Sequence, residues 1–598
     1  MTSTVERVRA AYTRIEEVDR PEVWISLRPR EDVEAEAARV DGRVAAGEWL
    51  PLAGTAFAVK GNIDVAGLPT TAGCPSYAYE PEADAPAVAR LRAAGAVVLG
   101  TTNLDQFATG LVGTRSPYGP VRNAVDPAYV SGGSSSGSAV AVALGIVDFA
   151  LGTDTAGSGR VPAAFNGVVG LKPTRGLVPT SGVVPACASL DCVTVFARTL
   201  PEAEQALSFM AAPRTRELPA LEQRRPGPWR IAVPRPGQLG ELDPGWAEAF
   251  ASAATRLADA GAELLEVDLA PFTEAAAMLY EGAFVAERYT AVGDFVDAHA
   301  DATDLDPTVA GIISGAGDIP AHRLCADLER LSVLRDRALA SLGDADALLL
   351  PTTPGHPTLA EVAADPLGAN ARLGRFTNST NLFDLAAVAV PAGEVDGLPF
   401  GVMLIGPAFT DERLVRVAGL LTTPPPRLGR VVEVPPVGRT TLLPQHDLAV
   451  VGAHLSGQPL NGQLLALGAR LVRTTTTAPV YRLYALDTSP PKPGLVRTVE
   501  GGAAIEAEVW RLSAEGLGTL LAALPRPMAL GTVELADGTC VTGFLCEPVA
   551  LDGAREITAH GGWRAALSAP RHAEDKTSAC EPPAPVPTTT TSAPPASP

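Results

Sequence analysis

Histidine is scarce in this sequence of 598 residues: there are seven, and the first is His299. A serine or cysteine nucleophile in the first 298 residues therefore has no nearby histidine in the chain to take its proton. Cysteine is equally rare, and neither the Cys187–Cys192 pair nor the Cys540–Cys546 pair has the neighbouring Cys or His pair of a zinc site. We interpret the cysteines as free, mostly buried thiols of a reducing cytoplasm and expect no metal.

A net positive charge and long apolar runs are also missing. The 47 Lys and Arg residues are outnumbered by 67 Asp and Glu, which gives a net charge of -20 and argues against nucleic acid or an anionic membrane surface as a partner. An anionic ligand would need a local site built from Arg, Lys or backbone amides. The apolar run 139–147 is too short to span a bilayer, and residues 1–9 lack the apolar segment of a signal peptide.

Hydrophobic periodicity predicts a large α/β domain over residues 1–423 with largely parallel strands. The predicted helices are 5–19, 85–94, 139–146, 246–260, 274–298 and 321–342, and the predicted strands are 52–59, 96–100, 149–152 and 347–350. The segment 114–137, rich in Gly, Pro, Asn and Ser, is long and irregular, which is typical of a functional loop.

Proline clusters divide the rest of the chain. Pro424–Pro426 and Pro435–Pro436 mark a linker, 424–446, before a second domain over 447–567. Strands are expected there at 448–454, 480–485, 507–512 and 539–546. The tail 568–598 is dominated by Pro, Thr, Ser and Ala and has little to bury, so we expect it to be disordered.

The N-terminal domain holds two serine motifs close together. They read Gly-Gly-Ser-Ser-Ser-Gly-Ser-Ala at 132–139 and Gly-Thr-Asp-Thr-Ala-Gly-Ser-Gly-Arg at 152–160. The five residues 133–137 also match G-x-S-x-G, the nucleophile elbow centred on Ser135, but no His-Gly-Gly-Gly motif precedes them. Another interpretation is that residues 132–138 form a flexible loop that caps the following helix.

Together with Lys60 in Val-Lys-Gly-Asn-Ile-Asp at 59–64, these motifs resemble the amidase signature family over about residues 5 to 425. The resemblance implies a large mixed β-sheet covered by helices on both faces. It also implies a Ser158–Ser134–Lys60 triad, with the middle serine at a cis peptide bond. No metal or organic cofactor is implied.

The chemistry of these residues fits an acyl transfer without histidine. Ser158 would attack the amide carbonyl, Ser134 would pass the proton on, and Lys60 would accept it if its pKa is lowered enough for it to be neutral. The backbone amides of the turn are candidates for an oxyanion hole; they belong to Thr155, Ala156, Gly157 and Ser158. We interpret Asp154 and Arg160, which flank the nucleophile, as structural.

Three further segments resemble the allophanate hydrolase branch of that family: Ala156 beside the nucleophile, 286–289 and 354–358. The segment from 450 to 461 resembles the start of its appended α+β domain, which is similar to the γ-glutamylcyclotransferase fold. The resemblance implies hydrolysis of allophanate to ammonia and N-carboxycarbamate in urea or triazine catabolism. We expect a cytoplasmic homodimer that acts on a small anionic amide.

Tyr280 and Arg288 are the candidates to hold the substrate. They are eight residues apart on the predicted 274–298 helix, about two turns along it. An arginine binds carboxylates with two parallel bonds, and the resemblance favours this role over a packed aromatic and a surface arginine. We interpret the adjacent Tyr289 as a packing residue.

The second domain offers weaker candidates. His454 follows a strand and either serves the structure or lines a pocket for a second step, and Glu506 and Glu508 either share that pocket or face water. Two other functions remain open: an amidase of broader specificity or an amidotransferase A-subunit, and an inactive scaffold whose second domain binds a partner.

Overall fold

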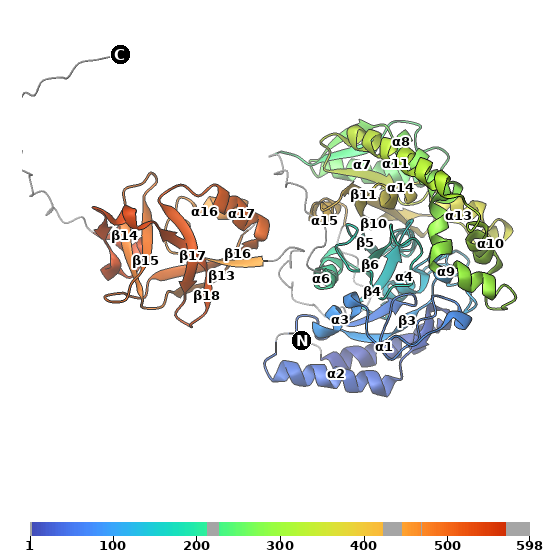
Figure 1. The fold of residues 1–598 in the computed structure, drawn as a ribbon, viewed down its shortest axis with the longest axis horizontal. Helices are drawn as coiled ribbons and strands as arrows, with labels where there is room; N and C mark the ends of the chain where they lie inside the picture. The colour runs from blue at the N-terminus through green and yellow to red at the C-terminus, as the bar shows by residue number, and fades with distance from the viewer. Residues whose placement is uncertain (1–2, 49, 212–226, 423–444, 468, 570–598) are drawn as a thin grey trace, which may run out of the picture. The chain divides into compact units, whose positions relative to one another are not determined.

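The computed structural model describes residues 3–48, 50–211, 227–422, 445–467 and 469–569 (Figure 1). The chain divides into two compact units, Met1–Leu442 and Leu443–Pro598, and each is described by itself. The predicted linker, 424–446, lies outside the described residues except for its last two positions. The predicted tail, 568–598, lies outside them except for its first two, so the domain boundaries remain predictions.

Within the described part of the first unit, eleven strands form one mixed sheet. In spatial order they are β1 (Trp24–Leu27), β3 (Val97–Thr102), β2 (Ala56–Lys60), β4 (Phe149–Asp154), β6 (Cys192–Ala197), β5 (Val169–Lys172), β10 (Leu385–Val395), β11 (Leu398–Pro407), β9 (Ala347–Pro351), β7 (Arg230–Pro234) and β8 (Glu263–Val267).

The expectation of largely parallel strands is correct only for parts of this sheet. Strand β2 pairs in parallel with β3 and β4, and β7 pairs in parallel with β8 and β9. The strands from β4 through β6, β5, β10 and β11 to β9 are antiparallel. One reason is local: β10 and β11 are joined by the two-residue turn Asp396–Gly397, where both residues have positive φ.

Helices cover both faces of the sheet, as expected (Figure 1). Alternate residues of β2 enter the two cores, with Ala56 and Ala58 in one and Phe57 and Val59 in the other. The helices that cover the first core are α1 (Thr4–Val18), α2 (Arg30–Ala45), α4 (Ser136–Ala143), α5 (Val161–Phe165), α8 (Ala270–Glu281), α11 (Ala321–Leu342) and α14 (Asn378–Leu382). Those that cover the second core are α3 (Pro86–Ala93), α6 (Leu200–Met210), α7 (Trp246–Asp259) and α15 (Asp411–Ala418).

The predicted helix 274–298 is wrong in one important respect, because it is interrupted. Helix α8 ends at Glu281, a single 3-10 turn covers Ala283–Val285, and α9 (Ala286–Ala298) begins after it. Gly282 leaves the helix in an extended conformation, and a Cβ there would lie 2.5 Å from the carbonyl oxygen of Met278. Helix α9 packs against α10 (Pro307–Gly315).

The second unit is an α+β domain with its own core. Its five-stranded sheet has the order β13 (Arg470–Thr476), β16 (Glu506–Ser513), β12 (Gln445–Val450), β18 (Cys540–Cys546) and β17 (Met528–Glu534), and a smaller sheet has the order β15 (Lys492–Arg497), β14 (Tyr481–Leu486) and β19 (Arg555–Glu556). The four predicted strands correspond to β12, β14, β16 and β18. Helices α16 (Asn461–Ala466), α17 (Ala514–Ala522) and α18 (Trp563–Ser568) complete the unit.

In the part of the chain that the structure describes, no helix is long and apolar enough to cross a membrane.

Candidate active site

The candidate site lies where two parallel strands end side by side. Lys60 is the last residue of β2, and Thr153 and Asp154 are the last two residues of β4. The serine-rich segment enters α4 at Ser136, three residues earlier than the predicted start of that helix. Loops that follow the carboxyl ends of parallel strands are the usual position of ligand sites in α/β sheets.

Lys60 is fully buried and forms two short hydrogen bonds. Its Nζ donates to Ser134 Oγ at 2.7 Å and to Thr153 Oγ1 at 2.7 Å. Burial lowers its pKa to about 7. This shift favours the neutral form of Lys60, which is the form that can accept a proton.

Four charges act on the pKa of Lys60. The carboxylates of Asp105, Asp191 and Asp154 raise it, and the guanidinium of Arg288 lowers it, but burial has the largest effect. These acids surround Lys60 without forming an ion pair with it within the described residues. This leaves the ammonium group without the close carboxylate partner that would keep it protonated.

The loop before α4 holds Ser134 in a tightly packed glycine segment. The peptide bond between Gly133 and Ser134 is cis, as the resemblance implied. A Cβ on Gly133 would lie 2.0 Å from Asp105 Oδ2, so only glycine fits there. Asp105 in turn accepts from the amides of Val112 and Gly113, and its own amide donates to the Ser134 carbonyl at 3.1 Å.

Ser158 lies in the turn that follows β4. Within the described residues, the backbone amides of Thr155, Ala156, Gly157 and Ser158 donate no hydrogen bond. Gly157 has φ +142, and a Cβ there would lie 2.4 Å from Thr377 Oγ1. The turn therefore leaves four adjacent amide donors for a ligand oxygen, which is the composition of an oxyanion hole.

Ser158 itself is 2% exposed, and its Oγ forms no hydrogen bond to any described residue. The relay between Ser158 and Ser134 is thus not closed in the structure. Catalytic hydrogen bonds often form only when the substrate is bound.

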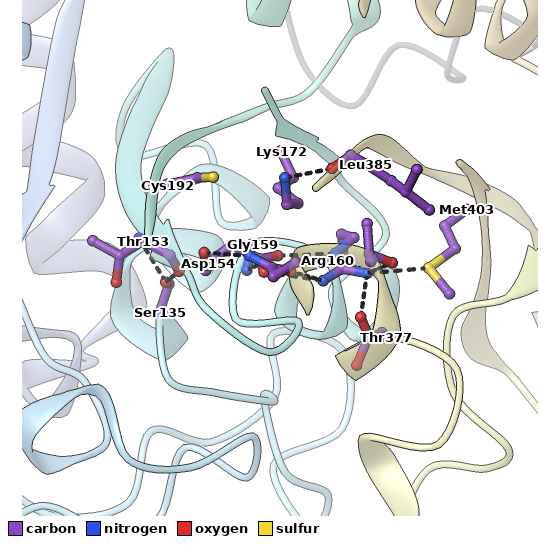
Figure 2. A network of polar contacts seen from close by, with 12 residues as sticks. Ser135, Thr153, Asp154, Gly159, Arg160, Lys172, Cys192, Thr377, Leu385 and Met403 are labelled. Atoms are coloured by element: carbon purple, nitrogen blue, oxygen red, sulfur yellow. Dashed lines mark hydrogen bonds and ion pairs between the residues drawn. The ribbon is translucent and has the colours of Figure 1, made fainter. Parts of the chain in front are cut away.

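Arg160 and Asp154, which flank Ser158 in the sequence, form a buried ion pair (Figure 2). Nε and Nη2 of Arg160 donate to the two carboxylate oxygens at 2.9 and 3.0 Å, and both side chains have 0% exposure. Nη1 also donates to the Thr377 carbonyl at 3.0 Å and to Thr380 Oγ1 at 2.8 Å. Burial alone would raise the pKa of Asp154, but Arg160 holds it below its ordinary value. The pair joins the turn that carries Ser158 to α14, which agrees with a structural role.

Ser135, the centre of the G-x-S-x-G match, forms hydrogen bonds with the backbone of β4. Its Oγ donates to the Thr153 carbonyl at 3.1 Å and accepts from the Thr153 amide at 3.3 Å (Figure 2). A hydroxyl that is buried and bonded in both directions is not presented to a substrate, and this argues against the nucleophile elbow.

Arg288 and Tyr280 are brought together, but across the break between α8 and α9 and not along one helix. Arg288 is 2% exposed; its Nη1 donates to Thr109 Oγ1 at 2.8 Å and its Nη2 to the Tyr280 hydroxyl at 3.2 Å. Within the described residues it has no ion-pair partner. The adjacent Tyr289 instead donates to Asp297 on the same helix, which fits its expected packing role.

Reasoning from the sequence missed two residues of the site. Lys60 donates hydrogen bonds to both Thr153 and Ser134. Thr153 lies inside the 152–160 motif, so its place in that motif could have indicated a role in the site. Thr109 contacts Arg288 from 179 residues away, and nothing in the local sequence pointed to it.

In the second unit, His454 lines a cavity of about 450 Å³. Its ring stacks on Phe544 at 4.8 Å, its Nε2 lies 3.1 Å from Gln463 Oε1, and burial lowers its pKa. The carboxylates of Glu506 and Glu508 instead bind Arg564 and are not among the residues that line this cavity. The suggestion that they share the cavity with His454 is therefore wrong.

In the part of the chain that is described, no group of three or more His, Cys, Asp or Glu residues is arranged to hold a metal ion.

Residues 6–415 match the Amidase family, and residues 446–568 match the allophanate hydrolase C-terminal domain. The chain is similar to the urea amidolyase of Saccharomyces cerevisiae, at 44% identity over 91% of this chain and 31% of that protein. It therefore spans about a third of the length of the curated urea amidolyase relatives.

Among solved structures, the chain resembles Kluyveromyces lactis allophanate hydrolase with 42% identity and a TM-score of 0.72, over 94% of this chain and 96% of that one. The glutamyl-tRNA(Gln) amidotransferase A-subunit of Symbiobacterium thermophilum is more distant, at 37% identity over 70% of this chain and 92% of that protein. The chain belongs to the amidase family, and its second unit is an allophanate hydrolase C-terminal domain.

Proposed function

We propose that this protein hydrolyses the terminal amide of allophanate, releasing ammonia and N-carboxycarbamate. One observation carries this proposal: the buried Arg288 has no carboxylate ion-pair partner within the described residues, and its charge acts on the pKa of Lys60, which is hydrogen-bonded to Ser134. Buried charges in proteins are normally paired, so this guanidinium fits a ligand that carries its own anion. Allophanate combines a primary amide with a carboxylate in one small molecule.

The proposed reaction has two halves. Ser158 Oγ attacks the amide carbon, its proton passes to Ser134, and the Ser134 proton passes to Lys60. The amides of the 155–158 turn stabilise the oxyanion. As the tetrahedral intermediate collapses, the proton returns through Ser134 to the leaving nitrogen, and ammonia departs. Water then attacks the ester on Ser158 while Lys60 accepts its proton through the same relay. The proton returns through Ser134 to Ser158 Oγ as its bond to the acyl carbon breaks, and the dicarboxylate is released.

The substrate carboxylate is assigned to Arg288 and Tyr280. Arginine carries five N–H donors, and the two bonds to Thr109 and Tyr280 leave three of them for a ligand. A neutral carboxamide would leave this buried charge uncompensated, which disfavours the alternative of a broad-specificity amidase. An amidotransferase A-subunit is the other alternative, but the match to that relative covers only 70% of this chain.

We assign the second unit to the next step, the breakdown of N-carboxycarbamate. The His454 cavity is large enough for a small dicarboxylate, and Lys492 also lines it. We therefore propose that it promotes the decarboxylation of N-carboxycarbamate, which ends in a total of two ammonia and two carbon dioxide. We propose that the protein is cytoplasmic, a location that the six free thiols among the described cysteines support, and that it forms a homodimer.

The test is ammonia release from allophanate, with mass-spectrometric identification of the product. Ser158→Ala should abolish release and Lys60→Ala should come close to doing so, while Ser135→Ala, the matched serine of the same loop, should keep most of the activity. Rapid turnover of ordinary carboxamides with little ammonia from allophanate would refute the assignment. His454→Ala should leave the first ammonia release intact and slow carbon dioxide release.

A further inference from the structure

Thr109 makes a contact that the proposed mechanism does not use. It is fully buried, its Oγ1 accepts from Arg288 Nη1 at 2.8 Å, and the same hydroxyl donates to the Phe107 carbonyl at 3.2 Å. The hydroxyl proton is therefore directed away from Arg288, and the oxygen lone pairs face the guanidinium. A hydroxyl held in this way fixes the plane of the guanidinium.

The backbone before Thr109 is unusual. Phe107 and Ala108 are consecutive non-glycine residues with φ of +50 and +53, a left-handed conformation that such residues rarely adopt. Conformations of this kind persist where the surrounding structure enforces them, and they cluster at functional sites. Here the conformation brings the side chain of Thr109 to Arg288.

The same loop is fastened to the helix that carries Arg288. The Phe107 ring packs on Phe295, seven residues after Arg288 on α9, with ring centroids 6.0 Å apart. The Thr109 carbonyl accepts from Arg115 Nη1 at 3.0 Å. Side-chain contacts from Phe107 and Thr109 thus hold this loop on α9 at two points.

The other end of the loop reaches the proposed relay. The Asp105 amide donates to the Ser134 carbonyl at 3.1 Å, four residues before Thr109. One short, buried segment, Asp105–Thr109, therefore contacts both Ser134 and Arg288.

We propose that Thr109 is a positioning residue that orients Arg288 toward the substrate carboxylate, and that the Asp105–Thr109 loop sets the separation between Arg288 and Ser134. The inference rests on the proposed function. It makes Thr109 a determinant of selectivity for short amides that carry a carboxylate, because the fixed separation matches one length of substrate.

The experiment compares Thr109→Val, which keeps the shape but loses the hydroxyl, with Thr109→Ser, which keeps the hydroxyl. Loss of a hydrogen bond to a charged group should raise KM for allophanate, and Ki for its carbon analogue malonamate, by about 10- to 100-fold. We expect kcat to change by less than about threefold, since the bond is present in ground and transition states alike. Thr109→Ser should restore KM to within about threefold.

A neutral probe distinguishes a change in the orientation of Arg288 from a disruption of the site around Ser158. The rate at which methanesulfonyl fluoride labels Ser158 reports the nucleophile without using the carboxylate site, and it should be the same in Thr109→Val and wild type. Thr101→Val is the matched control, since that buried hydroxyl has no hydrogen-bond partner within the described residues.

The inference is overturned if KM is unchanged in Thr109→Val, if labelling falls together with kcat, or if the variant fails to fold. Each of these results would show that Thr109 does not orient Arg288 and has either no role or a purely structural one. Failure of the proposed function would appear separately, as the absence of ammonia release from allophanate by the wild-type protein.

Discussion

Two arginines of the first unit are equally buried and have opposite surroundings. Arg160 is paired with Asp154 by two hydrogen bonds, and its other donors bond to the Thr377 carbonyl and to side chains of α14. Within the described residues, the only hydrogen bonds of the Arg288 guanidinium go to the hydroxyls of Thr109 and Tyr280. The first arrangement pairs the charge within the protein, which supports stability, whereas we propose that the second binds an anion from outside. Burial alone therefore does not distinguish a structural from a functional arginine, but the set of partners does.

Replacement of Arg160 is expected to have the largest effect. Arg160→Met leaves Asp154 buried without its partner, which typically lowers the free energy of unfolding by about 3–5 kcal/mol. Chemical denaturation measures this change. The control is a double variant, Arg160→Met with Asp154→Leu, which removes both charges and should recover part of the loss. If Arg160→Met is as stable as the wild type, Arg160 does not have the structural role that distinguishes it from Arg288.

Replacement of Arg288 should have the reverse profile. Arg288→Met removes a buried charge that has no carboxylate ion-pair partner within the described residues, so the free energy of unfolding should fall by no more than about 1 kcal/mol. KM for allophanate should rise by about 100-fold, since a bond between charged groups is lost. Steady-state kinetics and denaturation on one preparation provide both numbers. Strong destabilisation with an unchanged KM would show that Arg288 is structural.

The pH dependence gives a smaller effect. Lys60 must be neutral to accept a proton, and burial lowers its pKa to about 7. The rate of labelling by methanesulfonyl fluoride should therefore fall as the pH drops through about 7 and level off above it. Asp105, Asp191 and Asp154 raise this pKa and Arg288 lowers it. Arg288→Met should consequently move the acid limb to higher pH, and a shift to lower pH would contradict this electrostatic account.

The sequence allowed the nucleophile side of the site to be predicted better than the carboxylate side. Lys60, Ser134 and Ser158 lie in contiguous motifs at the ends of two adjacent parallel strands, so local patterns carry most of the information. Whether they act as the triad remains a prediction. The hydrogen bond between Lys60 and Ser134 is the geometric observation that favours it.

The carboxylate side depends on contacts between distant segments. Tyr280 and Arg288 were placed on one helix, but Gly282 ends α8, and the two residues meet across a turn. The hydrophobic pattern continues through this break, which is why periodicity did not reveal it. Thr109 comes from a loop 179 residues away, and its left-handed neighbours are Phe and Ala, which give no sequence signal for such a conformation.

The most direct test of the contrast between the two arginines is the thermal unfolding of wild type and Arg288→Met, with and without saturating malonamate. A ligand that binds only the folded state raises the unfolding temperature. We predict a clear increase for the wild type and none for Arg288→Met, with similar unfolding temperatures for the two proteins without ligand. An equal increase in both proteins would contradict the claim that Arg288 is held open for the substrate carboxylate.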